Sequence, residues 1–194
     1  DYEARDSLLY ALSLGMGTDP LDRDELPFVF EGLIDQPQLV VPSQCMVLGW
    51  QRFWQDDPDA GIDWQRIVHG EEHFEIHAPI PAAGRVRTHH RLVSVQDKGP
   101  GRGIVLQVDT ELFERDASTH LASLKSVQFL RGDGGCGSWG EPGDRAPALP
   151  AIADDAEPIA SVDYSTSPQA ALLYRVASRD RKSTRLNSSH LVIS

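Results

Sequence analysis

The sequence has few cysteines, few basic residues and no long hydrophobic run. Its 194 residues contain only two cysteines, Cys45 and Cys136, which are too few for a disulfide framework and favour a reducing compartment over secretion. Lys and Arg number 18 against 29 Asp and Glu, which gives a net charge of −11. Because nucleic-acid affinity rests on neutralising phosphates, we expect no nucleic-acid partner. No apolar run approaches the ~18 residues of a membrane span and no signal peptide opens the sequence, so we expect no membrane partner.

The first third of the chain predicts helices around one short strand. Leucines at helical spacing predict a helix over residues 2–16, which Gly15 helps to end. Residues 28–31 are aromatic and β-branched, so they predict a strand. Residues 39–54 are apolar with a mixed period, and Pro42 is a possible helix start.

The central part, residues 67–137, alternates between apolar and polar positions. From residue 68 onward the apolar side is predicted to hold Val68, Phe74, Ile76 and Ala78. The pattern is cleaner from residue 104, where the apolar positions are Ile104, Leu106, Val108 and Leu112. A period of two indicates half-buried antiparallel strands, and the turns between them are predicted at residues 79–81, 98–101 and 115–118. The fold class is therefore α+β, with a helix or second sheet covering the apolar face.

Four short motifs occur in order along this central part. They are Val68-His69-Gly70-Glu71, a Pro-x-Pro turn at 79–81, Asp97-Lys98-Gly99, and Leu130-Arg131-Gly132 followed by Gly134-Gly135. Together they resemble the MaoC-like enoyl-CoA hydratases, and more narrowly the amino-terminal half of the two-part, (R)-specific type-two hydratases found in peroxisomal multifunctional enzymes. The resemblance covers residues 2–178. It implies the hot dog fold, in which an antiparallel sheet wraps around a helix.

The resemblance also implies a function and three binding residues. In this family, water adds to a trans-2-enoyl-CoA to give the (R)-3-hydroxyacyl-CoA, in fatty-acid or side-chain β-oxidation. No cofactor is implied beyond the coenzyme A thioester, which is the substrate. The amino-terminal half receives the acyl-CoA, and by position the contacting residues are His69, Gly70 and Lys98. A glycine lets a backbone approach a bulky ligand, and a lysine at a hairpin tip can meet a phosphate as a point charge.

A second copy of the domain is predicted near the end of the chain. Leu8-Leu9-Tyr10-Ala11-Leu12 matches Leu172-Leu173-Tyr174-Arg175-Val176 at each apolar position. We therefore expect one hot dog unit over residues 1–141, a proline-rich linker over 142–158, and the truncated start of a second unit over 159–178. In the second unit, residues 162–164 are predicted to be extended and Ser167-Pro168 to begin a helix. The expected partner is a second hot dog unit or another copy of the chain, in the peroxisome of a eukaryote or the cytoplasm of a bacterium.

The last residues, 179–194, are polar, serine-rich and basic, and they resemble the translation of a sequencing adapter. We interpret them as a non-native tail. The family's acid/base pair belongs to an Arg-x-Ser-Gly-Asp-x-Asn-Pro-Leu-His motif, and here Asp180 lies seven residues before Asn187, where the motif requires two. We therefore assign no catalytic residue and expect His190 to be a chance match.

Several alternatives remain open for the function and for individual residues. The chain could be a non-catalytic acyl-CoA-binding or interaction module, or a hot dog thioesterase whose acidic residue would lie on a helix. His69, His73 and His77 suggest a metal, but His-Gly-Glu-Glu-His is not His-Glu-x-x-His, so we expect no metal. One strand face carries Arg85, Arg87, His89 and Arg91 and is either solvated or an anion-binding edge. Residues 132–137 predict a turn, and Cys136 is taken as structural.

Overall fold

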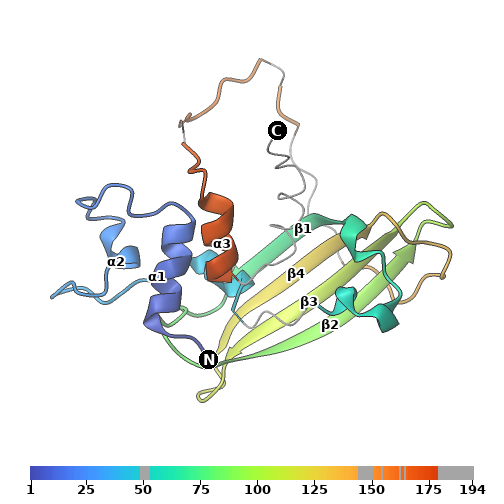
Figure 1. Cartoon of the computed structure of the whole chain (residues 1–194), viewed down its shortest axis with the longest axis horizontal. Coiled ribbons are helices and arrows are strands. Elements are labelled where there is room, and N and C mark those ends of the chain that lie inside the picture. Colours follow the sequence, from blue (N-terminus) through green and yellow to red (C-terminus); the bar gives the residue numbers. More distant parts are fainter. Residues whose placement is uncertain (49–52, 144–150, 154, 162, 164, 179–194) are drawn as a thin grey trace.

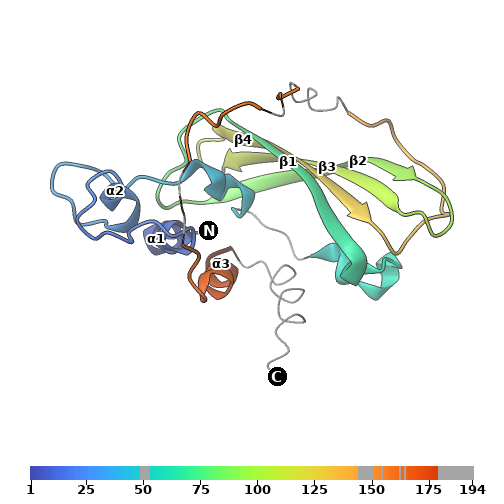
Figure 2. The same cartoon turned by 90° about the horizontal axis from the view of Figure 1, so that it is seen from above.

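A four-stranded antiparallel sheet forms the larger part of the molecule, and α-helices lie beside one end of it (Figures 1 and 2). The computed structural model describes residues 1–48, 53–143, 151–153, 155–161, 163 and 165–178. The strands are β1 (Ile67–Ile76), β2 (Val86–Asp97), β3 (Ile104–Glu114) and β4 (His120–Leu130). Their order across the sheet is β1-β4-β3-β2.

Two hairpins join β2, β3 and β4 into the predicted meander. The β2–β3 turn contains Gly99 and Gly101 at φ of 101° and 70°, and the β3–β4 turn contains Ser118 at φ of 58°. Glycine adopts this left-handed region at little cost, and among the described residues Ser118 is the non-glycine residue that does so. The predictions of turns at residues 98–101 and 115–118 are therefore confirmed.

The core lies on one face of the sheet, in two clusters. The first joins strand residues to the segment after the amino-terminal helices, and its buried members include Leu112, Ala122, Leu124, Cys45 and Leu48. The second lies at the other end of the strands and comprises Ile67, Ile104, Leu106 and Leu130, with Phe53 and Trp64 packed on it. The predicted alternation of β3 is confirmed, because its apolar positions face this core.

A β-bulge at Gly70 changes the faces of β1. The pairing with β4 runs His69 to Gln128 and then Glu71 to Val127, so Gly70 is the extra residue. Val68 therefore lies on the opposite face from Phe74, and Val68 is 43% exposed. The prediction that Val68 and Phe74 share one apolar side is wrong, because one inserted residue exchanges the two faces of a strand.

The helices α1 (Ala4–Ser13) and α2 (Leu26–Val29) come first in the chain. The predicted first helix is confirmed, and the Asp6 side chain caps it by accepting the Glu3 N–H at 2.8 Å. The predicted strand at residues 28–31 is wrong. Pro27 lies in the first turn of α2 and pre-organises a short helix there.

Single turns of 3₁₀-helix connect α2 to the sheet. They are η1 (Pro42–Met46), η2 (Trp54–Asp56), η3 (Pro58–Ala60) and η4 (Trp64–Arg66). The helix predicted to start at Pro42 is present as the short η1, which places Cys45 against the sheet. Residues 49–52 of the same prediction lie outside the described residues.

The helix α3 (Ala170–Ser178) packs beside α1, far from it in sequence (Figures 1 and 2). It begins three residues after Ser167, whose carbonyl accepts the Ala170 N–H at 3.0 Å. The predicted extended segment at 162–164 lies largely outside the described residues, as do residues 144–150 of the linker and the whole tail from residue 179.

Candidate functional site

The β2–β3 tip, residues 97–103, is bound to the glycine loop that follows β4, residues 131–137. One side chain makes most of the connection, because the Asp97 carboxylate accepts the N–H groups of Gly99, Gly135 and Gly137 at 2.8, 2.9 and 2.6 Å. The Gly103 N–H also donates to the Asp133 carbonyl at 2.9 Å. The tip and the loop therefore form one connected surface.

Glycine is required where the loop touches the tip. Gly134 has φ of 137°, and a Cβ atom there would collide with the carbonyl oxygen of Gly99. A Cβ on Gly135 would lie 3.2 Å from the Pro100 ring. The run of glycines at 134–137 is thus explained by close backbone packing and left-handed φ angles, and the prediction of a turn there is confirmed.

On this surface the negative charge of Asp97 is held by backbone N–H groups, whereas the positive charges of Lys98 and Arg102 are exposed. The N–H groups of Gly135, Gly99 and Gly137 hold the pKa of the Asp97 carboxyl below its ordinary value. Lys98 and Arg102 are exposed on the same turn, and the Lys98 ammonium lies 3.4 Å from the Gln96 side-chain oxygen. Within the part of the chain that the structure describes, neither cation lies in an ion pair.

His69 and Gly70 lie near the start of β1. The His69 Nε2 atom is 3.3 Å from a carboxylate oxygen of Glu72. A Cβ on Gly70 would lie 3.1 Å from the carbonyl oxygen of Val127 on β4. The bulge and the approach to β4 therefore already account for a glycine at position 70, whatever ligand it meets.

The three predicted binding residues lie at the same end of the sheet and on opposite edges. One row of paired residues crosses it, from Ile67 through Leu130 and Ile104 to Asp97. Three strand spacings separate the edges, which is roughly 14 Å. His69 and Gly70 are thus adjacent to each other, and Lys98 is not in contact with them. A ligand that touched all three would have to extend across the sheet.

A network of polar side chains lies on the face of the sheet that points away from the core, and the sequence analysis did not predict it. Glu111 on β3 accepts hydrogen bonds from His120 and Ser123 on β4, each at 2.7 Å, and the Ser123 hydroxyl lies 2.8 Å from His77 Nε2. The His77 and His120 rings have centroids 4.2 Å apart. Because His120 meets both Glu111 and Ser123 through the same nitrogen, the arrangement is not that of a serine–histidine–acid triad.

The arginines along β2 and just before it contact acidic or aromatic side chains. Arg85 pairs with Asp1 at 3.2 Å and Arg91 with Asp109 at 3.2 Å, while the Arg87 guanidinium lies 5.8 Å from the centre of the Phe113 ring.

Among the described residues no group of three His, Cys, Asp or Glu side chains is placed to hold a metal ion. In the same residues no helix is both long and apolar enough to span a membrane.

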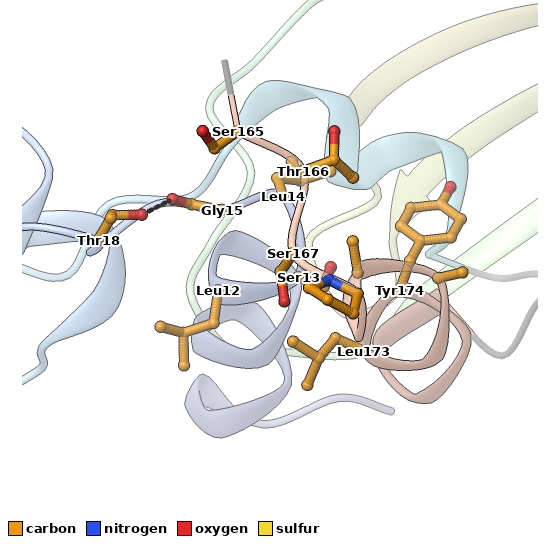
Figure 3. Close-up of a pocket in the computed structure, with 13 residues that line it drawn as sticks. Leu12, Ser13, Leu14, Gly15, Thr18, Ser165, Thr166, Ser167, Leu173 and Tyr174 are labelled. Carbon is orange, nitrogen blue, oxygen red and sulfur yellow. Dashed lines mark hydrogen bonds between the residues drawn. The ribbon is translucent and has the colours of Figure 1, made fainter.

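A cavity of about 780 Å³ opens between α1, α3 and the segment leading into α3. Figure 3 shows its apolar walls, with Leu12 and Leu14 on one side and Leu173 and Tyr174 on the other. Hydroxyl groups of Ser165 and Thr166 lie at its rim. None of His69, Gly70 or Lys98 lines this cavity, so it is separate from the predicted binding residues.

Comparison with known proteins relates most of the chain to hydratases. The chain is 29% identical over 184 residues to the peroxisomal enoyl-CoA hydratase 2 of Arabidopsis thaliana, covering 91% of this chain and 59% of that protein. It is 30% identical over 197 residues to the probable enoyl-CoA hydratase 2 of Dictyostelium discoideum, covering 96% of this chain and 59% of that protein. The chain thus spans 59% of the length of each of these relatives.

Solved structures share the fold. The MaoC-like dehydratase of Phytophthora capsici superposes with a TM-score of 0.71 at 24% identity, covering 98% of this chain and 64% of that one. The peroxisomal multifunctional enzyme type 2 of Drosophila melanogaster gives 0.68 at 23% identity, covering 97% and 32%. The expected hot dog fold is thereby confirmed. The family model described as the MFE-2 hydratase 2 N-terminal domain matches residues 1–132, and the chain belongs to that family.

Proposed function

We propose that this chain is the acyl-CoA-binding, amino-terminal half of an enoyl-CoA hydratase that converts trans-2-enoyl-CoA to (R)-3-hydroxyacyl-CoA. The observation that carries the proposal is the family match over residues 1–132, which includes the Asp97-Lys98-Gly99 tip. The exposed Lys98 supports it, because a chain with a net charge of −11 needs a local cation to receive an anionic ligand.

The reaction adds water across a carbon–carbon double bond. A base takes a proton from water, the oxygen bonds to C3, and C2 receives a proton, while the thioester oxygen carries negative charge in the transition state. The 194 residues contain no Gly-Asp-x-Asn-Pro-Leu-His motif, the segment that would supply the acid/base pair. We therefore assign this chain the binding of substrate and give the proton transfers to a second hot dog unit.

The proposed binding residues have separate roles. Lys98 meets a phosphate of coenzyme A, while His69 and Gly70 contact the ligand at the opposite edge of the sheet. To touch residues at both edges, a bound thioester has to extend over a sheet roughly 14 Å across. The coenzyme A thioester is substrate, and the proposal includes no further cofactor. The compartment we propose is the peroxisome in a eukaryote and the cytoplasm in a bacterium.

A non-catalytic acyl-CoA-binding module is the second candidate. The missing acid/base motif favours it, because such a module needs only the binding residues and a partner unit. A turnover assay separates the two functions when the chain is mixed with a complete second hot dog unit. Hydration by the mixture supports the hydratase half, whereas binding without turnover supports the module.

An NMR titration with a long-chain acyl-CoA tests the binding itself. Half of a site binds weakly, so we expect a dissociation constant near 1 mM, or about −4 kcal/mol. Lys98→Ala should weaken binding by about 1 kcal/mol, the size of one partly exposed phosphate contact. Arg115→Ala, at the opposite hairpin, is the matched control and should leave binding unchanged. Shifts that leave both the tip and residues 68–71 unaffected would contradict the proposal.

A further inference from the structure

The β2–β3 tip carries two cations and a carboxylate whose charge is already compensated. Lys98 and Arg102 are exposed on one short turn, which is closed by hydrogen bonds from the Lys98 N–H to the Gly103 carbonyl and from the Arg102 N–H to the Gly99 carbonyl, both 3.0 Å. Arg102 also folds along the turn, because a Cβ on Gly99 would lie 3.8 Å from its Cδ. The family motif draws attention to Lys98 and leaves Arg102 without a role.

We infer that Arg102 is a second phosphate-binding residue beside Lys98, and that Asp97 is the positioning residue that holds both cations in place. The inference rests on the proposed function, since it names the part of the ligand that this tip receives. That part is the phosphate-bearing end of coenzyme A, namely its diphosphate and 3′-phosphate, and not the acyl chain. Two cations on one turn suit a ligand with several phosphate oxygens, because each can neutralise a separate group.

Asp97 would oppose phosphate binding if its charge were free. It directly precedes Lys98, and an unpaired carboxylate beside a phosphate costs affinity through like-charge repulsion. Here three backbone N–H groups point at that carboxylate, so its charge is offset by fixed dipoles and Lys98 and Arg102 remain available. The other carboxylate of the loop, Asp133, accepts the Asp63 N–H at 3.2 Å.

Asp97 also reduces the freedom of the turn. Two of its three hydrogen bonds reach across to Gly135 and Gly137, so the turn is tied to the loop that follows β4. The chain after this loop is itself attached to the sheet, because Trp139 and Val95 exchange backbone hydrogen bonds at 2.8 and 2.9 Å. A turn fixed on both sides loses less conformational entropy when a ligand binds, and this raises affinity.

The test compares an acyl-CoA with a ligand that lacks its phosphate-bearing nucleotide end and with phosphate alone, using the full 194-residue chain. Binding of an acyl-CoA, of the same acyl-pantetheine and of inorganic phosphate is measured for the unmodified protein and for Arg102→Ala, Asp97→Asn and Arg115→Ala. We expect Arg102→Ala to weaken acyl-CoA binding about fivefold and to leave acyl-pantetheine binding unchanged. Arg115→Ala, an exposed arginine on the opposite hairpin, should change neither.

Asp97→Asn has a readout of its own. It should weaken acyl-CoA binding by a similar factor, leave acyl-pantetheine binding unchanged, and speed hydrogen exchange at the Gly99, Gly135 and Gly137 amides. A merely structural role would weaken both ligands equally, and that result overturns the positioning role.

The outcomes separate the inference from the proposed function. If acyl-CoA binds but Arg102→Ala binds it as well as the unmodified protein does, the second phosphate contact is overturned while the proposed function stands. If inorganic phosphate competes as strongly as coenzyme A, the tip is a general anion site and the coenzyme A assignment is overturned. If the unmodified chain binds no acyl-CoA at all, the proposed function and the inference both fail.

Discussion

Tyr10 and Tyr174 pack against each other, with ring centroids 6.4 Å apart and ring planes inclined by 49°. They occupy the same position in the repeated pentapeptides at residues 8–12 and 172–176. The helix α3 lies against α1 through this pair. Leu172 and Val176, on the same helix, remain 60% and 68% exposed.

The first prediction concerns the docking of α3. Tyr174→Ala should lower the hydrogen-exchange protection of the α3 amides at least about fivefold, since an aromatic pair of this kind contributes roughly 1 kcal/mol beyond its buried area. Leu172→Ala, a more exposed position on the same helix, is the control and should change little. Equal loss of protection in both variants would show that the tyrosine pair does not hold the helix.

The second prediction follows from the lowered pKa of the Asp97 carboxyl. Its folded pKa lies below the ordinary value of 3.8, so the unfolded chain binds more protons between the two values. The stabilisation is therefore fully present above the ordinary pKa and is lost as the pH falls through the folded pKa. Urea unfolding from pH 7 to pH 2 should show Asp97→Asn less stable at pH 7, with the difference shrinking below pH 4. A difference that stayed constant with pH would contradict the assigned hydrogen bonds.

The third prediction concerns the contact between the glycine loop and the tip. Gly134→Ala should lower the free energy of unfolding by about 3 kcal/mol, because the new Cβ meets the Gly99 carbonyl and φ is positive. Gly101→Ala is the matched control, since its φ is 70° and no atom lies within 4 Å of the added Cβ. It should cost about 1 kcal/mol through backbone strain alone. Similar costs in the two variants would mean that the loop does not pack on the tip.

The fourth prediction concerns the two thiols. Burial raises the pKa of the Cys45 thiol to about 11. Cys45 is 1% exposed, whereas Cys136 is exposed to solvent. Because the thiolate is the reactive form, iodoacetamide at pH 8 should modify Cys136 and spare Cys45. Mass spectrometry of the native protein should show one adduct, Cys136→Ser should show none, and both cysteines should react in urea. Early labelling of Cys45 would contradict its buried position.

The fifth prediction is that the 194-residue chain alone does not hydrate crotonyl-CoA or decenoyl-CoA. Acid/base groups of this kind each contribute a factor of about 10²–10⁴, and the motif that carries them is missing. The measurement is loss of absorbance of the conjugated thioester against a blank. Activity that His190→Ala abolished would show that the tail is functional.

The sequence predicted the sheet well where the pattern was unbroken. β3 has no inserted residue in its pairing with either neighbour. The residues expected to be buried, such as Leu106 and Leu112, are 3% and 0% exposed. Gln107 lies on the other face of β3 from these residues and is buried too, because a later segment covers it and the Gly143 N–H donates to its side-chain oxygen at 3.1 Å. The alternation of apolar and polar residues in a strand cannot predict that a segment far along the chain will cover one of its polar residues.

Other features depended on geometry that no local pattern contains. The bulge at Gly70 reversed the face of Val68, and a lone glycine in a strand is only a weak indication of a bulge. The hydrogen bonds between Glu111, His120 and Ser123 require the register of β3 against β4. The role of Asp97 was missed for a similar reason, since Gly135 and Gly137 lie 38 and 40 residues further along the chain.

The strand order makes β1 an edge of the sheet, and its charges govern what can pair there. Glu71, Glu72 and Glu75 lie close together on this edge strand, with His73 and Phe74 between them. Two molecules meeting β1 to β1 would bring these carboxylates opposite one another, and like charges directly across a strand pair are unfavourable. The acidic edge therefore discourages the sheet from growing by self-addition, as edge strands of natural proteins commonly do.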